Sequence, residues 1–301
     1  MKDLIIVGGG PSGLTAAIYA IRKRLDVLLI SPDLGGKTNW RMYLPDNMDH
    51  YQVITGDEIV SRFKSQIEYL EFSRKTEVCE KVKAIQGGYA VTTKEGNQYE
   101  AKAVILATGT IPAKLNVPGE DQYRLHGLAY SAVSYAPTFI NRVVAVVGDG
   151  ELAVRSALEL AQAARQVYFI LPASSILENA LGEKVKTAQN ISILEGYAVK
   201  EIKGDGSYAR SIVIAKGTKE DELAVDATFV EFNLTPNSEC VAGLVALNEK
   251  KQVIVDCNTR SSQPGIFAAG DVTDTYAEQV LICIGEGAKA ALSAYEYILS
   301  L

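Results

Sequence analysis

Two stretches of this chain each combine a short apolar run, a glycine-rich turn and the start of a helix. The first is Asp3–Gly13, DLIIVGGGPSG, and the second is Arg142–Ala153, RVVAVVGDGELA. Each apolar run is rich in β-branched residues, which is typical of a parallel strand buried on both faces. The small residues that follow match the pattern G-x-G-x-x-G/A, as Gly8, Gly10 and Gly13 in the first stretch and as Gly148, Gly150 and Ala153 in the second.

This pattern favours the binding of a nucleotide pyrophosphate because each small residue has a separate task. The first turns the chain tightly, the second lets the backbone approach the phosphates, and the third lets the helix pack on the strand. The helix N-terminus then offers free N–H groups and about half a positive charge. The alternative is a glycine turn that binds nothing, but the first copy continues into the helical sequence LTAAIYAIRKR. The sequence therefore predicts an α/β fold with two nucleotide sites, the second formed by Gly148, Gly150, Glu151 and Leu152.

The composition agrees with a soluble globular enzyme of two domains. Of 301 residues, 48% are hydrophobic and 22% charged, and the net charge is −6 at pH 7. Because nucleic-acid binding needs clustered Lys and Arg, the lack of a basic block argues against a nucleic-acid partner. No apolar run reaches the roughly 18 residues of a membrane helix, and the N-terminus enters a strand directly. We therefore expect a cytoplasmic protein without a membrane partner.

The residues that could bind a metal or act as a thiol nucleophile are few. The chain has four cysteines and two histidines, far apart and without a C-x-x-C motif: Cys79, Cys240, Cys257, Cys283, His50 and His126. These residues lack the close spacing that a zinc site needs and offer no evident Cys-His pair for a nucleophile, so we expect no metal. Each cysteine is expected to be a small buried residue.

Three further segments are expected to approach a nucleotide bound at the first glycine turn. The second strand, Asp26–Ile30, ends in Ser31 instead of the acidic residue that commonly holds the ribose hydroxyls. Gly35–Thr38 forms a second close-approach turn with amine and hydroxyl donors. The apolar run Ala103–Thr110 is expected to be the next parallel strand, and it ends in the small residues Ala107–Gly109.

Seven motifs in one order carry a family resemblance: IVGGGPSGLTAAIYA, GG at 35 and 36, ATGT, NVPGEDQYRLHG, VVGDGELA, GIFAAGDV and QVLICIGEGAKAALSAYEYI. By these motifs the chain resembles the low-molecular-weight thioredoxin reductases and the related flavoprotein subunit of alkyl hydroperoxide reductase, over essentially its whole length. The resemblance implies two three-layer Rossmann-like domains. Residues 1–113 and 237–301 would bind FAD, residues 114–236 would form an inserted NAD(P)H-type domain, and the protein would be a homodimer.

The resemblance also implies which residues contact FAD. Gly8–Gly13 would hold the pyrophosphate, Ala107–Gly109 would lie along the adenosine, Asp271 would bind the flavin-side ribityl or phosphate, and Gln279 with Val280 would meet the ring. A helix starting near Gln279 would direct its positive end toward the flavin edge that gains charge on reduction. With the segments above, the predicted contact residues are Gly8, Gly10, Pro11, Ser12, Gly13, Ser31, Gly36, Lys37, Thr38, Ala107, Thr108, Gly109, Gly270, Asp271, Gln279 and Val280.

The chain departs from the family at the redox-active Cys-x-x-Cys, which the family follows with an aspartate. Ser131 and Ser134 stand at the two cysteine positions, and Tyr135 replaces the aspartate. Serine forms neither a disulfide nor a thiolate adduct with flavin, so the family's dithiol transfer is excluded in this polypeptide. Because the aspartate is also replaced, natural divergence is favoured over a laboratory exchange of the cysteines. The catalytic residues are left unassigned.

A second departure concerns the nicotinamide nucleotide. Family members that use NADPH carry arginines just after the strand that follows the second glycine turn, because a 2′-phosphate needs fixed cations. Here Val167–Leu171 is followed by Pro172, Ala173 and two serines, and an acidic residue for NADH is missing too. Arg155 and Arg165 are expected on the solvated face of the intervening helix. We expect poor NAD(P)H binding, or an adenine nucleotide or a second FAD in this site.

Three functions stay open at this level. The first is an FAD-dependent oxidoreductase of thioredoxin-reductase type without the dithiol centre, exchanging electrons with a small redox protein such as ferredoxin or thioredoxin, or with a small compound. The second is a ferredoxin-NADP reductase-like flavoenzyme, which the missing arginines disfavour. The third is a non-catalytic flavin-binding or sensory protein.

Overall fold

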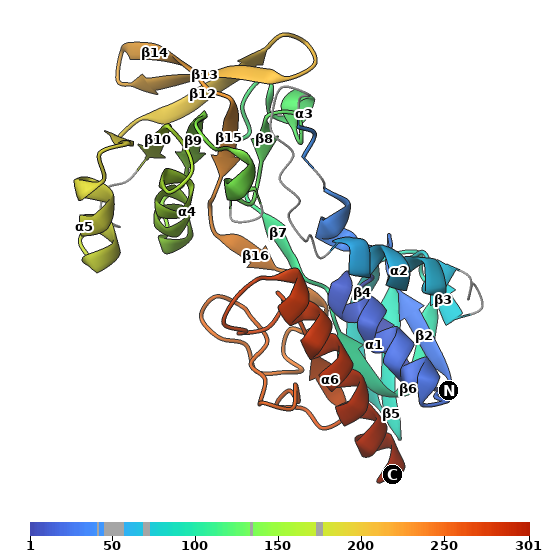
Figure 1. Ribbon diagram of the computed structural model, residues 1–301. Coiled ribbons are helices and arrows are strands. Elements are labelled where there is room, and N and C mark those ends of the chain that lie inside the picture. Colours follow the sequence, from blue (N-terminus) through green and yellow to red (C-terminus); the bar gives the residue numbers. More distant parts are fainter. Residues whose placement is uncertain (41, 45–56, 69–72, 133–134, 173–176) are drawn as a thin grey trace. The chain divides into compact units, whose positions relative to one another are not determined.

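The computed structural model describes residues 1–40, 42–44, 57–68, 73–132, 135–172 and 177–301. They divide into two compact units (Figure 1). The first unit contains the described residues of 1–40, 55–111 and 235–301, and the second contains residues 42–44 and the described residues of 112–234.

The first unit is built on a parallel sheet with the strand order β3-β2-β1-β6-β17, which antiparallel β5 and β4 extend beside the first half of β6. The strand order reverses between β1 and β6, the kind of position where open α/β sheets bind ligands at the carboxyl ends of their strands. The element bounds are β1 Lys2–Val7, α1 Pro11–Arg22, β2 Val27–Ile30, η1 Gly36–Asn39, α2 Asp57–Glu68, β3 Arg74–Lys75, β4 Cys79–Ile85, β5 Gly88–Thr93, β6 Gln98–Leu106, η5 Glu239–Val241, β17 Ile266–Ala268 and α6 Val280–Leu299.

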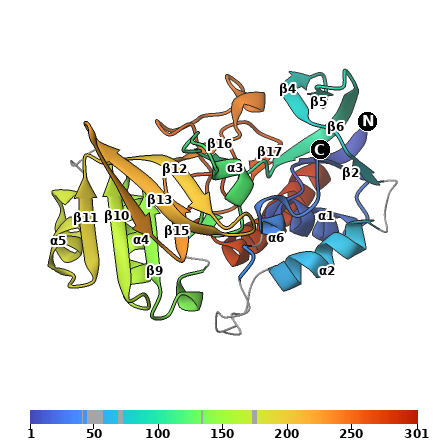
Figure 2. The same ribbon diagram turned by 90° about the horizontal axis from the view of Figure 1, so that it is seen from above.

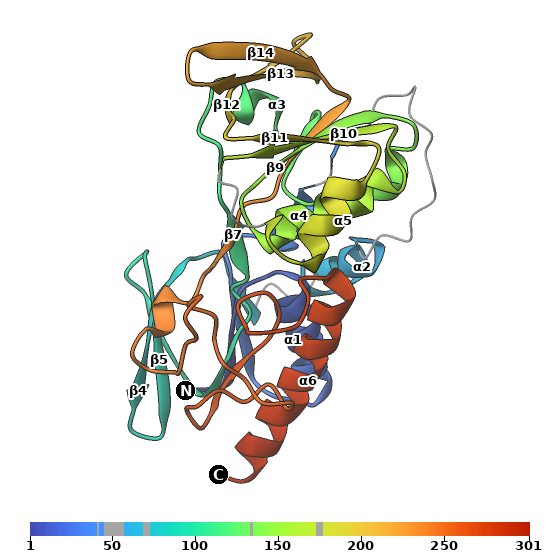
Figure 3. The same ribbon diagram turned by 90° about the vertical axis from the view of Figure 1, so that its left-hand side faces the viewer.

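The packing of the central strand β1 explains why its sequence is apolar from Leu4 to Val7. Leu4 and Ile6 pack in a core with residues of α1, α2 and α6, which lie together on one face of the sheet (Figure 3). Ile5 and Val7 pack in a separate core with β4, β5 and the segment that follows η5. Because successive residues of a strand point to opposite faces, a strand covered on both sides needs an apolar residue at every position.

Strand β6 differs from the strand expected at Ala103–Thr110. It begins at Gln98, because its first residues pair with β5. It ends at Leu106, after which Ala107–Gly109 form a loop with Gly109 at a φ of +66°. The small residues of this segment therefore lie beyond the strand, at the carboxyl edge of the sheet.

The second unit repeats the same plan. Its parallel strands lie in the order β11-β10-β9-β15-β8, of which Figure 2 labels the first four and Figure 1 labels β8, and α4 follows β9 as α1 follows β1. The hairpin expected around Ile202–Lys216 is a three-stranded antiparallel sheet of β12, β13 and β14, because the chain turns again into Lys219–Ala224. The bounds are β8 Leu128–Ala129, α3 Glu120–Tyr123, η3 Ala136–Thr138, β9 Val143–Val147, α4 Glu151–Ala161, β10 Gln166–Leu171, α5 Ala180–Thr187, β11 Ile191–Glu195, β12 Ala198–Gly204, β13 Ala209–Lys216, β14 Lys219–Ala224 and β15 Ala227–Val230.

These two sheets confirm the predicted fold class, two Rossmann-like α/β domains. The chain passes between the units through β7 (Thr110–Pro112) and β16 (Leu234–Pro236), which pair with each other. The units divide after residues 111 and 234, two residues before the boundaries expected from the sequence. Residues 42–44 correct that expectation, since they belong to the second unit. Met42 is buried in its core, and the Tyr43 ring stacks on His126 at 5.7 Å.

The contact between α1 and α6 generates a prediction about stability. A Cβ on Gly287 would lie 2.1 Å from the backbone oxygen of Ser12, whereas a Cβ on Gly285, in the same helix, would meet nothing within 4 Å. We expect Gly287→Ala to lower the free energy of unfolding by about 1–3 kcal/mol through overpacking. Gly285→Ala should raise it by up to about 1 kcal/mol through helix propensity. Urea unfolding of both variants measures the difference, and equal effects would contradict the close packing of the two helices.

Candidate functional site

In the first glycine turn, backbone atoms block the Cβ positions of Gly8 and Gly13, whereas the Cβ position of Gly10 is open. A Cβ on Gly8 would lie 2.1 Å from the carbonyl oxygen of Ala107, and one on Gly13 would lie 1.8 Å from the carbonyl oxygen of Gly8. Both glycines are therefore needed for strand, turn and helix to pack as they do. At Gly10 no heavy atom lies within 4 Å of the Cβ position. This opening leaves room for a phosphate group against the backbone.

Helix α1 begins beside this opening with an uncapped N-terminus. Gly10 is its N-cap and Pro11 its first residue, no side chain caps it, and its first turn holds no acidic residue. Ser12 is buried, and a Cβ on Gly270 would lie 2.3 Å from its hydroxyl oxygen. Ser12 thus packs against the C-terminal segment and has its backbone N–H to offer a ligand. The turn fits an anionic group such as the pyrophosphate of a dinucleotide.

The turn at Gly35 and Gly36 is joined directly to the first glycine turn. The N–H of Gly35 donates to the carbonyl oxygen of Gly9 at 2.7 Å, and a Cβ on Gly36 would lie 3.2 Å from the Cα of Gly10. The hydroxyl of Thr38 donates to the carbonyl oxygen of Gly35 at 2.7 Å. The Thr38 donor is therefore used inside its own turn, and the segment supports the opening at Gly10 from the side.

The carboxyl end of β2 opens into a cavity of about 260 Å³. Ser31 lies there, buried, and its hydroxyl donates to the carbonyl oxygen of Asp33 at 2.7 Å. In Rossmann-like domains this end of the second strand holds the ribose. The charged residues that line the cavity are Asp33, Lys64, Glu68, Arg74 and Lys75.

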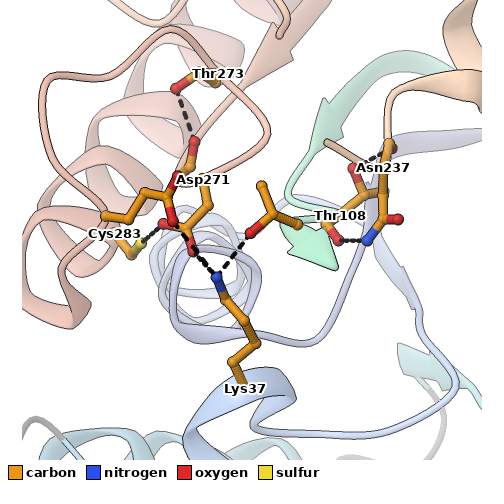
Figure 4. A network of polar contacts seen from close by, with 9 residues as sticks. Lys37, Thr108, Asn237, Asp271, Thr273 and Cys283 are labelled. Atoms are coloured by element: carbon orange, nitrogen blue, oxygen red, sulfur yellow. Dashed lines mark hydrogen bonds and ion pairs between the residues drawn. The ribbon is translucent and has the colours of Figure 1, made fainter. Parts of the chain in front are cut away.

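Lys37 connects the glycine pair to the C-terminal part of the first unit (Figure 4). Its Nζ lies 2.7 Å from Asp271 Oδ2 and 3.8 Å from Glu278 Oε2, and it donates to the hydroxyl of Thr110 at 2.7 Å. The Asp271 side chain is 11% exposed and the Lys37 side chain 34% exposed, so solvent reaches this ion pair from the lysine side. One ammonium thus holds three distant segments of the first unit together.

Two carboxylates that the sequence reasoning missed adjoin this network. Burial raises the pKa of Glu278 to about 7, and the charge of Asp271 adds to the effect although Lys37 opposes it. Glu286 accepts hydrogen bonds from the N–H of Gly270 and the hydroxyl of Thr275, both at 2.7 Å. Glu278 directly precedes Gln279 and Glu286 lies inside a motif of the resemblance, which is the only signal that could have found them.

The Ala107–Gly109 loop is held to the returning chain by reciprocal bonds. The hydroxyl of Thr108 donates to the carbonyl oxygen of Asn237 at 2.7 Å, and the Asn237 amide donates to the carbonyl oxygen of Thr108 at 2.9 Å (Figure 4). The N–H of Asn237 also donates to the carbonyl oxygen of Gly109 at 2.9 Å. These bonds fix the loop that Gly8 packs against.

Helix α6 begins with a second uncapped N-terminus in this unit. Gln279 is the N-cap and Val280 the first residue, and neither a capping side chain nor an acidic residue lies in the first turn. Cys283, one turn later, donates its S–H to Asp271 Oδ1 at 3.1 Å. Burial and the Asp271 charge raise the pKa of the Cys283 thiol, so it is protonated at neutral pH and is not a nucleophile.

The second glycine turn has the same shape with less room. A Cβ on Gly148 would lie 2.3 Å from the carbonyl oxygen of Glu231. A Cβ on Gly150 would lie 3.2 Å from the Asn233 side chain, whereas the space at Gly10 is open. This turn is therefore the tighter of the two.

Helix α4, which follows this turn, carries its own acidic group at the N-terminus. It starts at Glu151, with Leu152 half-buried behind it. The Glu151 carboxylate forms an ion pair with Arg155 at 2.6 Å. A carboxylate in the first turn already interacts with the positive helix end, which weakens the attraction for a phosphate.

The arginines of the second unit lie differently from expectation. Arg155 is on the exposed face of α4, as expected, and engages Glu151. Arg165 is not on that helix, which ends at Ala161. Its N–H bonds the carbonyl oxygen of Arg142 just before β10 begins, because the chain has already turned into the sheet. It thus lies at the amino end of β10, away from the edge where a 2′-phosphate would be held.

The Ser-x-x-Ser segment follows β8 in the second unit, and Ser134 lies outside the described residues. Ser131 is half-buried, and the N–H of the next residue, Ala132, donates to the buried Glu231 carboxylate at 2.5 Å. The hydroxyl of Tyr135 accepts a hydrogen bond from the N–H of Met42 at 2.9 Å. All four cysteines of the chain belong to the first unit. The second unit therefore has no sulfur at the position where the family carries its dithiol.

The chain was compared with families of known proteins. The model of the pyridine nucleotide-disulphide oxidoreductase family matches residues 2–287. The chain belongs to this family. It is 34% identical over 300 residues to a subunit of alkyl hydroperoxide reductase in Staphylococcus aureus strain MSSA476, and the match covers 99% of this chain and 59% of that relative. The chain thus spans about three fifths of the length of the curated relatives it matches.

Solved structures agree with this placement. Thioredoxin reductase from Streptococcus pyogenes MGAS5005 matches 100% of this chain and 99% of its own, with a TM-score of 0.89 and 30% identity. A ferredoxin-flavin thioredoxin reductase from Clostridium acetobutylicum covers 99% of this chain and 98% of its own, with a TM-score of 0.51 and 27% identity. These findings confirm the resemblance to thioredoxin-reductase-like flavoproteins, a family that implies FAD and a nicotinamide nucleotide.

Within the described ranges, no group of three or more His, Cys, Asp and Glu side chains could hold a metal ion. Among the helices described, none is both long and apolar enough to cross a membrane.

The difference between the two glycine turns generates a prediction about flavin binding. Gly10→Val should fold, because the Cβ position is open and φ is −71°, but its side chain would fill the space of a phosphate. We expect the Kd for FAD, measured by titrating the flavin-free variant, to rise at least about tenfold, a loss of roughly 1.4 kcal/mol in binding. Gly150→Val is the matched control and should keep the wild-type Kd. An unchanged Kd in Gly10→Val would contradict the site.

The raised pKa of Glu278 generates a prediction about pH. The folded protein, freed of nucleotide, holds a proton on Glu278 up to about pH 7, whereas the unfolded chain loses it near the ordinary value of 4.5. The native state therefore binds more protons, and this contribution to stability is lost as pH rises from 4.5 through 7. Glu278→Gln should lose less stability than wild type between pH 5 and pH 8 in urea unfolding. Parallel pH profiles would contradict the raised pKa.

Proposed function

We propose that this chain is an FAD-dependent oxidoreductase of thioredoxin-reductase type that passes electrons through its flavin without the family's dithiol centre. The observation that carries the proposal is the contrast between the two units. The first has an open glycine turn beside an uncapped helix, whereas Ser131 and Ser134 stand where the second unit should carry sulfur. A hydroxyl cannot accept an electron pair as a disulfide does. Electrons must therefore leave the flavin directly to the acceptor.

The residues present in the first unit fit FAD. The backbone at Gly10 and the start of α1 would hold the pyrophosphate, and Asp271 with Lys37 would meet the ribityl chain or a phosphate. The N-terminus of α6 would stabilise negative charge on the ring edge through its free N–H groups. When bound, FAD supplies the capacity to accept and donate electrons singly or in pairs. The role of this chain's residues is to bind it, orient it and set the charge around it.

The second unit is proposed to bind nicotinamide nucleotides poorly. No arginine stands among the four residues directly after Leu171, the end of β10, and Glu151 already occupies the N-terminus of α4. A phosphate at this turn would meet a carboxylate and lack the bidentate cation that usually holds it. An adenine nucleotide or a second FAD are the other candidates for this site.

A small redox protein is the proposed electron partner. The similar structure from Clostridium acetobutylicum is named a ferredoxin-flavin thioredoxin reductase, and this name links a protein of the same fold to ferredoxin. Ferredoxin would supply electrons without a functional nicotinamide site. We also propose, from the family resemblance, that the protein is a homodimer in the cytoplasm.

Two measurements on the purified protein test this proposal. Heat release and quantification should give about one FAD per chain, and about two would place a flavin in the second unit as well. Anaerobic stopped-flow reduction should then be fast with reduced ferredoxin and slow with NADPH or NADH. Fast bleaching by NADPH would favour a ferredoxin-NADP reductase-like enzyme. Failure with every physiological donor would favour a non-catalytic flavoprotein.

The serines themselves generate a further prediction. If they carry no electrons, Ser131→Ala combined with Ser134→Ala should leave the rate of flavin reduction by ferredoxin and of reoxidation by the acceptor unchanged within about twofold, or 0.4 kcal/mol in activation free energy. The same assay on Gly10→Val gives the control for loss of flavin. A loss of more than tenfold in the serine variant at full flavin content would overturn direct transfer from the flavin.

A further inference from the structure

Two cysteines that are 161 positions apart in the sequence meet in the first unit. Cys79 opens β4, and Cys240 is the middle residue of η5, the short helix that follows the second crossover. Cys240 is 8% exposed in the core that lies beneath the sheet, and Cys79 packs against the same core from a half-buried position. Figures 2 and 3 show the short orange helix beside β4. The sequence spacing alone gave no reason to pair them.

The backbone on both sides of this contact is held in place. The hydroxyl of Ser238, the N-cap of η5, donates to the carbonyl oxygen of Lys251 at 2.6 Å, and Asn237 is fixed to Thr108. On the other side Cys79 pairs with Thr93 across the β4-β5 ladder. Neither sulfur therefore sits on a loose loop, and their contact is a fixed feature of the fold.

The chemistry of the two thiols is unequal. The neighbouring Cys79 thiol lowers the pKa of Cys240. The contact with Cys240, together with burial, raises the pKa of Cys79. A thiolate beside a protonated thiol is the arrangement in which one sulfur reacts and the other resolves the product.

We propose that Cys79 and Cys240 form a reversible dithiol/disulfide site in the first unit, oxidised by small hydroperoxides such as hydrogen peroxide. The Cys240 thiolate attacks one peroxide oxygen, so that an S–O bond forms, the O–O bond breaks and hydroxide leaves as water after taking a proton. The Cys79 sulfur then attacks the Cys240 sulfur. The S–S bond forms, the S–O bond breaks, and the second water leaves with the Cys79 proton. Two thiols lose two electrons, and one peroxide becomes two waters.

The topology gives this bond a large effect on the chain. The loop that it closes contains residues 80–239, and therefore the whole of the described second unit between residues 112 and 234. A disulfide here would join the strand before the first crossover to the helix after the second. The bond would make the first unit covalently continuous across the insertion. This inference does not depend on the electron donor or on the occupant of the second nucleotide site.

Peptide mapping of the whole flavoprotein tests the site. The protein is treated with hydrogen peroxide at a few equivalents, alkylated without reduction, digested and analysed by mass spectrometry. We expect one linked peptide pair containing Cys79 and Cys240, about 2 Da lighter than the sum of the two peptides, which dithiothreitol separates again. Sulfinic or sulfonic acid on either residue without the linked pair would overturn the proposal. So would both thiols staying free while the exposed Cys257 is oxidised.

Variants separate this pair from general thiol oxidation. Cys257→Ser, which removes the exposed thiol, should still lose two titratable thiols on oxidation and recover both with dithiothreitol. Cys240→Ser should lose none. Cys79→Ser should lose at most one, as sulfenic acid on Cys240, and should form no linked peptide pair. Circular dichroism and flavin content check that each variant is folded. Because the mapping on wild type needs no variant, the proposal stays testable if Cys240→Ser fails to fold.

Discussion

No side chain fits between β1 and the loop that follows β6 at their carboxyl ends, and the first unit is organised around this constraint. Gly8 lies so close to the Ala107 carbonyl, and Gly13 so close to Gly8, that any Cβ would overlap backbone. At the carboxyl edge of the sheet, the backbones of β1, of the loop after β6 and of the start of α1 therefore pack directly against one another. The space at Gly10 is a consequence of this tight packing, because the chain must turn there without filling the turn.

The charged groups of the first unit depend on that arrangement. Once the turn at Gly35 is bonded to Gly9, Lys37 is placed where it reaches Asp271 and Glu278 from the far end of the chain. Asp271 is the least exposed of these three groups, so its charge depends most on the Lys37 cation. An anionic ligand that engaged Lys37 would change the protonation of Glu278, so the proposed nucleotide binding would be coupled to proton uptake at this point.

The sequence predicted those parts of the fold that depend on local pattern. The glycine spacing and the β-branched runs identify β1, α1, β9 and α4. A tight turn requires glycines at fixed positions and a strand buried on both faces requires a run of apolar residues, so both can be recognised in consecutive residues. It could not predict that β6 extends back to Gln98, because that depends on pairing with β5. Glu278 and Glu286 were missed for a related reason. A carboxylate in or beside a helix is usually solvated and unpaired. Only the folding of distant segments shows that Glu278 lies 3.8 Å from Lys37 and that Glu286 accepts hydrogen bonds from Gly270 and Thr275.

The insertion has a consequence for the order in which the molecule becomes complete. Strands β8 to β15 of the second unit follow one another between residues 128 and 230, so this unit can form as soon as that segment has left the ribosome. The first unit waits for Asn237 to lock the Thr108 loop, for β17 to pair with β6 and for α6 to cover α1. During synthesis β1, β2 and β6 therefore lack β17 and α6 at a stage when the second unit, encoded between β6 and β17, can already be folded. A flavin held by both the first glycine turn and α6, as proposed, would therefore bind only after the end of the chain has been made.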